Sequence, residues 1–316
     1  MRSLILTALL LHFIVFFSMG QGKKTDTNDH YNQLESRYQK LKDSLSLSYH
    51  FSPAVSSVIL NNKQIEVNFF NSILSANRYR DENGKLFNSI ARTSYLFSSI
   101  QLTYGLSKKA RWNIGLDINA KAGRRDNDLN SSIFNIFNSR VEGNSEYAKA
   151  ITSISPRIRW KPFRRNYHFT LQSSIILPIS INTEKEDILG INQTYFLTQL
   201  LYTQPLSERL FLFPQIALQY GFKNDKATSI FYSPLTCYLG YLIPRKTILF
   251  SLINYVPILK KQKSWNYDAC TFQIGVGLQY HISKNILFNA YYSKDIIGKN
   301  YNYFDSYNVG LCFVSN

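Results

Sequence analysis

The sequence predicts an all-β protein: a transmembrane up-and-down antiparallel β-barrel of about 12 strands, preceded by a short N-terminal helix. Three features of the 316 residues predict this fold. Long segments alternate between apolar and polar residues, the connections between them alternate between short and long, and the chain begins with an export signal. An exported chain with these features is typical of a membrane protein that crosses the bilayer with strands.

Residues 1–20 have the composition of a secretory signal peptide. Arg2 is the single charge in this stretch, and an apolar run from Leu4 to Phe17 follows it. The run is shorter than the roughly 20 apolar residues that a membrane-spanning helix needs. We therefore expect export of the chain and cleavage before Gln21 rather than an anchored N-terminus.

The clearest strand covers residues 111–124. One face carries only apolar side chains, from Trp112, Ile114, Leu116, Ile118, Ala120 and Ala122. The other face carries polar residues and glycine, including Asp117 and Lys121. A period of two over this length fits a tilted membrane strand of about 9–11 residues. Related patterns occur near 65–76, 92–106, 151–160, 167–179, 194–204, 210–221, 231–243, 247–256, 271–282, 286–293 and 306–314.

The connections between these segments are of two kinds. Five are short: 107–110, 161–166, 205–209, 244–246 and 283–285. Six are long and polar: 77–91, 124–150, 180–193, 222–230, 257–270 and 294–305. Barrels of the outer membrane have short periplasmic turns and long outer loops. A sheet in lipid must also close, because an open edge would leave backbone polar groups unpaired. We therefore expect a barrel over residues 64–316, with apolar faces toward lipid and polar faces toward the lumen.

Residues 21–63 form a separate N-terminal segment. A short amphipathic helix is indicated by apolar residues three or four apart, at Tyr31, Leu34, Tyr38, Leu41 and Leu45. Two interpretations remain open. The segment docks in the lumen and plugs the pore, or it is a periplasmic leader without a role of its own.

Polar residues on the inward faces are the candidates for lining a pore: Asp117, Lys121, Arg157, Arg159 and Gln172. If Trp112 and Trp160 lie at one depth, Asp117 is diagonal to Arg157 on the next strand, within reach of a long side chain. Asp117, Lys121, Arg157 and Arg159 would then form one small network in the lumen. This network either faces a solute or consists of structural ion pairs that fill a modest barrel. Bulky inward residues suggest a narrow or obstructed passage; they are Phe70, Phe211, Phe213, Tyr238 and Tyr291.

Trp112 and Trp160 also flank short connections on the lipid-facing side, where an interfacial aromatic girdle belongs. Basic residues concentrate in the same turns: Lys108, Lys109, Arg111, Lys161, Arg164, Arg165, Arg209, Arg245, Lys246 and Lys284. They either attract phospholipid headgroups or keep tight turns soluble. Because the cations behind the net charge of +16 are dispersed and the chain is exported, we expect no nucleic-acid partner.

The sequence predicts neither an enzyme nor a metal or cofactor site. The five histidines do not fall at metal-ligand spacing, and no nucleophile–histidine arrangement is evident. The three cysteines (Cys237, Cys270 and Cys312) lie on strands that are not expected to bring them together, so we expect free thiols.

The segments 92–106 (RTSYLFSSIQLTYGL) and 112–118 (WNIGLDI) resemble outer membrane barrels of Bacteroidetes, in particular those similar to the phenol-degradation meta-pathway transporters. The resemblance extends over most of residues 64–316 and implies an outer membrane location and a transport role. It assigns no functional residue. The chain departs from such barrels at its end, where Phe313 is followed by three more residues instead of closing the strand.

The leading hypothesis for function is therefore a passive channel or transporter for small molecules in the outer membrane of a Gram-negative cell. The alternative is a non-conducting barrel that serves as a binding or structural platform through its extracellular loops. Expected partners are outer membrane lipid, the barrel assembly machinery and a small-molecule solute. The oligomeric state is left open.

Overall fold

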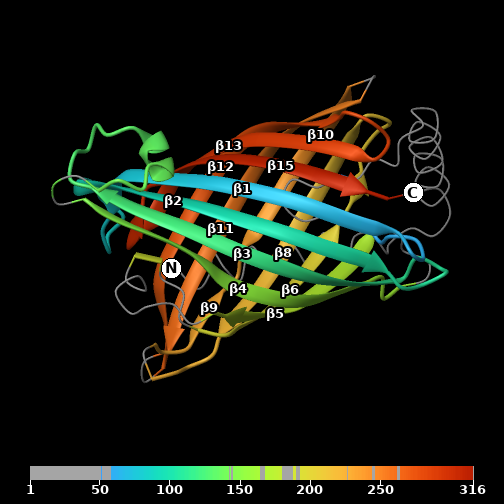
Figure 1. The fold of residues 1–316 in the computed structure, drawn as a ribbon, viewed down its shortest axis with the longest axis horizontal. Helices are drawn as coiled ribbons and strands as arrows, with labels where there is room; N and C mark the ends of the chain where they lie inside the picture. The colour runs from blue at the N-terminus through green and yellow to red at the C-terminus, as the bar shows by residue number, and fades with distance from the viewer. Residues whose placement is uncertain are drawn as a thin grey trace, which may run out of the picture.

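The computed structural model describes residues 51, 58–141, 143, 145–163, 168–179, 188–189, 193–225, 227–243, 246–261 and 264–315. Its strands form one antiparallel sheet that curls into a barrel (Figure 1). The predicted signal peptide and N-terminal helix lie outside the described residues. Within the described ranges, no helix has the length and apolar character to cross a membrane.

The long strands are β1 (Ile65–Arg80), β2 (Leu86–Gly105), β3 (Trp112–Asp126), β4 (Glu146–Trp160), β5 (Phe169–Pro178), β6 (Tyr195–Tyr202), β8 (Leu210–Gly221), β10 (Leu235–Ile243), β11 (Thr247–Lys261), β12 (Trp265–His281), β13 (Ile286–Lys299) and β15 (Asp305–Val314). Three short pieces are β7 (Gln204–Pro205), β9 (Ile230–Tyr232) and β14 (Tyr301–Asn302). Each short piece continues the line of a long neighbour, namely β6, β10 and β15. The 15 described pieces, less these three, make the twelve barrel strands that the sequence predicts.

The barrel closes without a free edge. Strand β15 pairs with β1 along its whole length, from Val314 opposite Glu66 to Asp305 opposite Ser75. The other end of the strand order is joined by pairing of β10 with β8. Closure pairs the backbone groups that an open sheet would leave unpaired in lipid.

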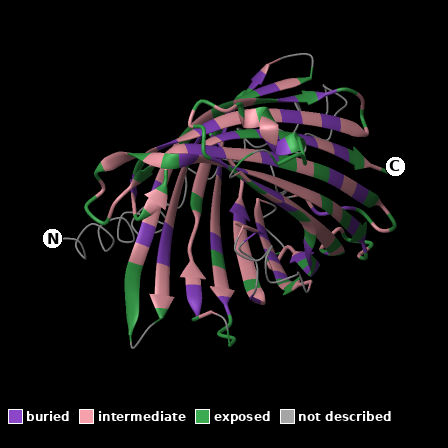
Figure 2. Cartoon of the chain, turned by 60° about the vertical axis from the view of Figure 1, so that its left-hand side comes forward, coloured by how far each residue is buried: buried purple, intermediate pink, exposed green. Residues whose placement is uncertain are grey.

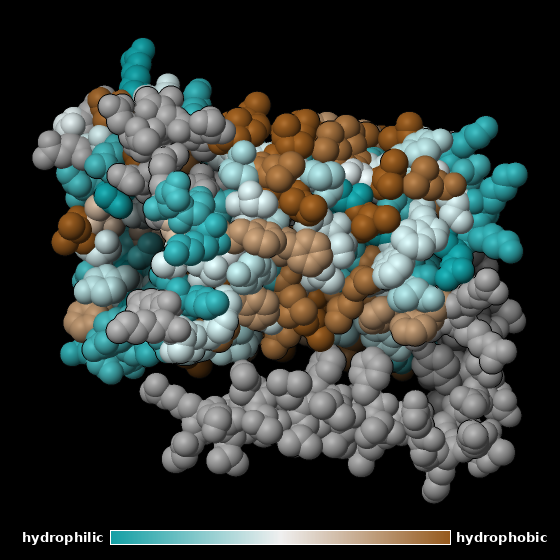
Figure 3. All heavy atoms as spheres, turned by 90° about the horizontal axis from the view of Figure 1, so that it is seen from below, coloured by the Kyte–Doolittle hydropathy of each residue, from teal (hydrophilic) through white to brown (hydrophobic). Residues whose placement is uncertain are grey.

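Burial alternates along the strands as the two-faced pattern predicts (Figure 2). In β4, Ser153, Ser155, Arg157 and Arg159 are buried and point inward, whereas the apolar residues between them face outward. Apolar side chains gather over the middle of the barrel wall, and hydrophilic ones lie at both ends (Figure 3). This is the reverse of a soluble protein and matches a wall surrounded by lipid.

Several long connections are shorter than the sequence predicts. The expected loop 77–91 is reduced to a turn between β1 and β2, and the expected loops 257–270 and 294–305 are mostly strand. Because both faces of these extensions contain polar residues, their sequence does not alternate between apolar and polar residues. Backbone pairing between strands needs no apolar face, so the sheet continues beyond the apolar belt.

The connection between β3 and β4 is long, as predicted, and packs against the outer side of the barrel. The side chain of Arg124, at an outward position of β3, donates to the carbonyl oxygens of Asn138 (2.8 Å) and Arg140 (3.1 Å). The loop contains a short helix, η1 (Ile133–Phe137), in which Ile136 is buried. Its packing leaves Phe134 and Phe137 exposed and places the loop beside the barrel rather than inside it.

Candidate functional site

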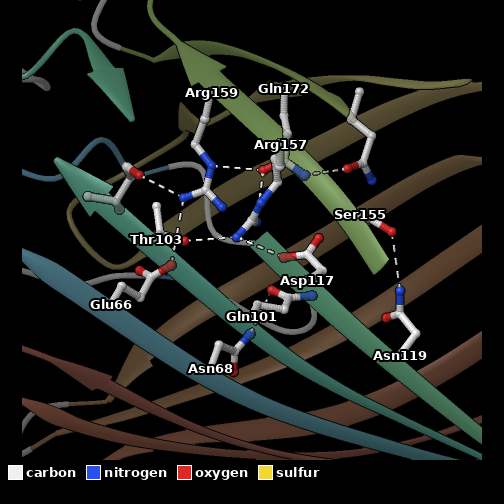
Figure 4. Close-up of polar contacts among 12 residues, drawn as sticks. Glu66, Asn68, Gln101, Thr103, Asp117, Asn119, Ser155, Arg157, Arg159 and Gln172 are labelled. Atoms are coloured by element: carbon white, nitrogen blue, oxygen red, sulfur yellow. Dashed lines mark hydrogen bonds and ion pairs between the residues drawn. The ribbon is translucent and has the colours of Figure 1, made fainter. Parts of the chain in front are cut away.

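A cluster of polar side chains fills the lumen in the half of the barrel nearer the short turns (Figure 4). Its centre is Arg157 on β4, whose guanidinium lies 3.1 Å from Asp117 on β3 and donates to Thr103 on β2 (2.8 Å). Asp117 stands opposite Ser155, so its contact with Arg157 is the diagonal one that the sequence predicts. Gly115, directly opposite Arg157, makes this possible, because a Cβ there would come within 2.9 Å of the guanidinium.

Gln172 on β5 joins the two arginines. Its side-chain oxygen accepts from Arg157 (3.2 Å) and from Arg159 (2.9 Å), and its amide nitrogen donates to Gln199 on β6 (2.7 Å). The structure therefore brings Asp117, Arg157, Arg159 and Gln172 into one network. Each of them is an inward residue that the sequence analysis selected.

Lys121 does not belong to this network. It lies four residues beyond Asp117 on β3, toward the long loops, where its ammonium group donates to the carbonyl oxygen of Leu189. The same group lies 4.4 Å from the ring centre of Tyr95 and 4.9 Å from that of Phe97. Lys121 thus belongs to an upper part of the lumen where a residue of the β5–β6 connection reaches inside.

The sequence analysis did not select Glu66, which lies in the same cluster. This carboxylate on β1 is 2% exposed and stands 3.8 Å from the guanidinium of Arg159. The cluster therefore contains two arginines and two carboxylates, and their formal charges cancel. The alternation along β1 predicts that Glu66 points inward, because it shares a face with Asn68. Its pairing with Arg159 could not be predicted in the same way, because β4 is distant in sequence.

A residue from before the first strand occupies the lumen beside this cluster. Phe51 is 6% exposed and sits among four inward aromatic rings, at centroid distances of 5.2–5.5 Å and with edge-to-face geometry; the rings are those of Phe211, Phe213, Tyr238 and Phe250. Edge-to-face pairs at these distances are favourable. We call this arrangement the aromatic box.

The residues that lead into β1 are held in the same place. Arg159 donates to the carbonyl oxygen of Val58 (2.9 Å), and Ile59 and Leu60 are 5% and 1% exposed. The backbone nitrogen of Lys63 donates to the carbonyl oxygen of Gly105, and the nitrogen of Gly105 donates to that of Gln64, which ties the chain to the end of β2. Phe51, Ile59 and Leu60 therefore pack inside the short-turn half of the barrel, whereas Asn61 and Lys63 are exposed.

The long-loop half of the lumen has open space. A cavity of about 890 Å³ lies there, lined mainly by aromatic and charged residues, including Tyr79, Tyr95, Phe97, Tyr232, Tyr301, Phe304, Arg80, Lys121, Asp81 and Glu82. Tyr301 lies next to the outer turn at Asn300, where burial raises its pKa to about 12. Its hydroxyl therefore stays neutral at physiological pH. We call this cavity the vestibule.

The two predicted girdle residues form a pair on the outside of the barrel. Trp112 stands directly opposite Trp160 in the β3–β4 register, and their ring centres are 4.8 Å apart. Both lie at the end of their strands next to a short turn. Their role as interfacial anchors remains a prediction.

Comparison with known proteins supports the fold. No family model matches the chain, and no curated protein matches it. Among solved structures, the chain is similar to an outer membrane channel from Pseudomonas putida F1, with a TM-score of 0.62 and 11% sequence identity over 82% of this chain and 98% of that one. It is also similar to the beta domain of the Bordetella autotransporter Brka, with a TM-score of 0.53 and 11% identity over 80% and 99% of the two chains. The fold, together with a barrel wall that is apolar outside and polar inside, defines a β-barrel of the outer membrane type.

Proposed function

We propose that the protein is an outer membrane channel for small molecules, closed in this structure by its own N-terminal segment. The observation that carries the proposal is the division of the lumen. One half holds the vestibule, and the other half is filled in part by Phe51 and the residues before β1, which are not strands of the barrel.

The division matters because a side chain of the barrel wall cannot leave the lumen, whereas a preceding segment can. In the short-turn half, inward side chains such as Phe213, Gln279 and Asn289 are almost completely buried, which indicates that this half of the lumen is packed around the docked segment. Withdrawal of Phe51 would free the space between the four rings of the aromatic box. Under this proposal, residues 1–20 direct export of the chain, and the barrel is of the kind that it resembles in sequence, the transporter-like barrels of Bacteroidetes.

The vestibule supports uptake from the long-loop side. Several aromatic rings offer apolar and edge contacts, and charges of both signs lie at its wall, from Lys121 and Arg80 and from Asp81 and Glu82. Concave sites with apolar walls and a few polar groups are typical of small-molecule sites. A platform that acts through its outer loops would not require such an internal cavity, which makes the channel the better-supported function.

Conductance measurements test the proposal. The mature chain and a variant lacking residues 21–60 would be reconstituted in planar bilayers and in vesicles loaded for swelling assays. We expect rare or small openings from the full chain, and larger conductance with faster sugar permeation from the shortened variant. Heat-modifiable migration in gels would verify that both barrels are folded. A folded, shortened barrel that conducts nothing would overturn the channel function in favour of the structural platform.

A further inference from the structure

Two neighbouring short turns carry an unusual concentration of positive charge. The first connects β2 to β3 and contains Lys108, Lys109 and Arg111, and the second begins with Lys161 directly after β4. Lys108 and Lys109 are exposed, and the described residues of the two turns, 106–111 and 161–163, include no carboxylate. We call these residues the turn pair.

The turn pair is built as one rigid unit. The backbone nitrogen of Lys161 donates to the carbonyl oxygen of Arg111 (3.0 Å), and the guanidinium of Arg111 donates to the carbonyl oxygens of Lys161 (3.3 Å) and Pro162 (3.4 Å). In the first turn, Ala110 adopts a φ of 47° and its nitrogen donates to Ser107. The cations are therefore presented together at a fixed place on the rim.

An apolar, aromatic surface continues from the turn pair onto the barrel wall. Trp112 and Trp160 lie directly above it, and Leu106 and Phe163 are 48% and 57% exposed beside it. The outward rows of β3 and β4 continue with exposed aliphatic residues such as Ile114. The indole nitrogen of Trp160 is itself buried, so the two tryptophans present ring surface rather than a hydrogen-bond donor at this place.

This combination matches the chemistry of one ligand. A phospholipid has acyl chains for the aliphatic rows, a glycerol region at the depth of the tryptophan rings, and a phosphate at the depth of the cations. Each cation next to an anionic membrane surface strengthens binding to that surface by about fivefold. A zwitterionic headgroup would bring its own ammonium group close to the cations, which opposes binding.

We propose that the turn pair is a binding site for an anionic phospholipid of the inner leaflet, of the phosphatidylglycerol type. The proposal rests on the outer membrane location that belongs to the proposed function, with the short turns facing the periplasm. It does not require that the barrel conduct. The site would anchor the barrel at the same rim where the N-terminal segment enters the lumen.

Quenching of tryptophan fluorescence by brominated lipid tests the site, because Trp112 and Trp160 lie next to the turn pair and serve as reporters. The chain has three tryptophans, so Trp265→Phe leaves Trp112 and Trp160 as the only emitters. This variant would be placed in vesicles of phosphatidylcholine and phosphatidylglycerol at one fixed ratio, with bromine on either the neutral or the anionic lipid. We expect brominated phosphatidylglycerol to quench several-fold more strongly than its share of the bilayer predicts.

Charge-reversal variants separate a built site from general attraction. Lys108→Glu with Lys109→Glu should remove the preference. Lys246→Glu with Lys284→Glu, in two other short turns, changes the net charge equally and should preserve it. Loss of the preference in both variants, or its absence in the Trp265→Phe parent, would overturn the proposal. If the first variant fails to fold by heat-modifiable migration, Lys108→Gln with Lys109→Gln replaces it. Failure of the parent itself to insert into vesicles would instead count against the outer membrane location.

Discussion

Phe51 offers the most direct test of how the lumen is closed. Its ring is almost completely buried and contacts four aromatic rings of the wall edge to face. Replacing a buried phenylalanine by alanine removes about 3–5 kcal/mol of packing free energy. If the loss falls on the docked state alone, Phe51→Ala raises the ratio of undocked to docked segment by roughly 10² to several times 10³, since about 1.4 kcal/mol corresponds to a factor of ten.

Single-channel recording measures the open probability, which depends on the ratio of undocked to docked segment. We expect long openings from Phe51→Ala under conditions where the unmodified chain is mostly closed. The unitary conductance should equal that of the variant lacking residues 21–60, because both share one open lumen. Phe134→Ala is the matched control, since that ring is 63% exposed on η1 and touches no part of the lumen. Equal open probability in Phe51→Ala and the unmodified chain would show that Phe51 does not hold the segment in place.

Three further results are expected. Arg159→Leu leaves the buried carboxylate of Glu66 without its facing cation, so the free energy of unfolding in urea should fall by about 3–5 kcal/mol; Arg125→Ala, which breaks an exposed pair, should cost less than about 1 kcal/mol. Gly240→Ala would place a Cβ 2.2 Å from the ring of Phe211, and a loss of about 1–3 kcal/mol in the same titration would verify this crowding. Thiol titration of the denatured protein should count three free cysteines, whereas a count of one would reveal a disulfide.

Local sequence pattern predicts the barrel wall well, for a reason that the structure makes clear. A strand in lipid must show apolar side chains on one face, and this requirement acts on each segment separately. The phase of β3 and β4 therefore followed from the sequence, and with it the inward direction of Asp117, Arg157, Arg159 and Gln172. The diagonal contact between Asp117 and Arg157 was also predictable, because neighbouring strands of a hairpin share a register set by their tryptophans.

The strand ends were predicted less accurately. Beyond the apolar belt no face of a strand is constrained by lipid, so β2, β11, β12 and β13 continue through polar residues that read as loop. Hydrogen bonding between neighbouring strands extends them there, and this pairing has no side-chain signature in either strand alone. The placement of Lys121 differed for a related reason, because its acceptor, the Leu189 carbonyl oxygen, belongs to a distant connection.

The sequence by itself determined that the chain forms a twelve-stranded barrel with a polar interior, because the alternation and the turn lengths are local properties. Only the tertiary structure decided what fills that interior. Phe51 meets the aromatic box, and Glu66 meets Arg159, across the curvature of a closed sheet, between residues separated by many strands in sequence. Such contacts depend on the radius and closure of the whole barrel, and no segment of the chain encodes either of them alone.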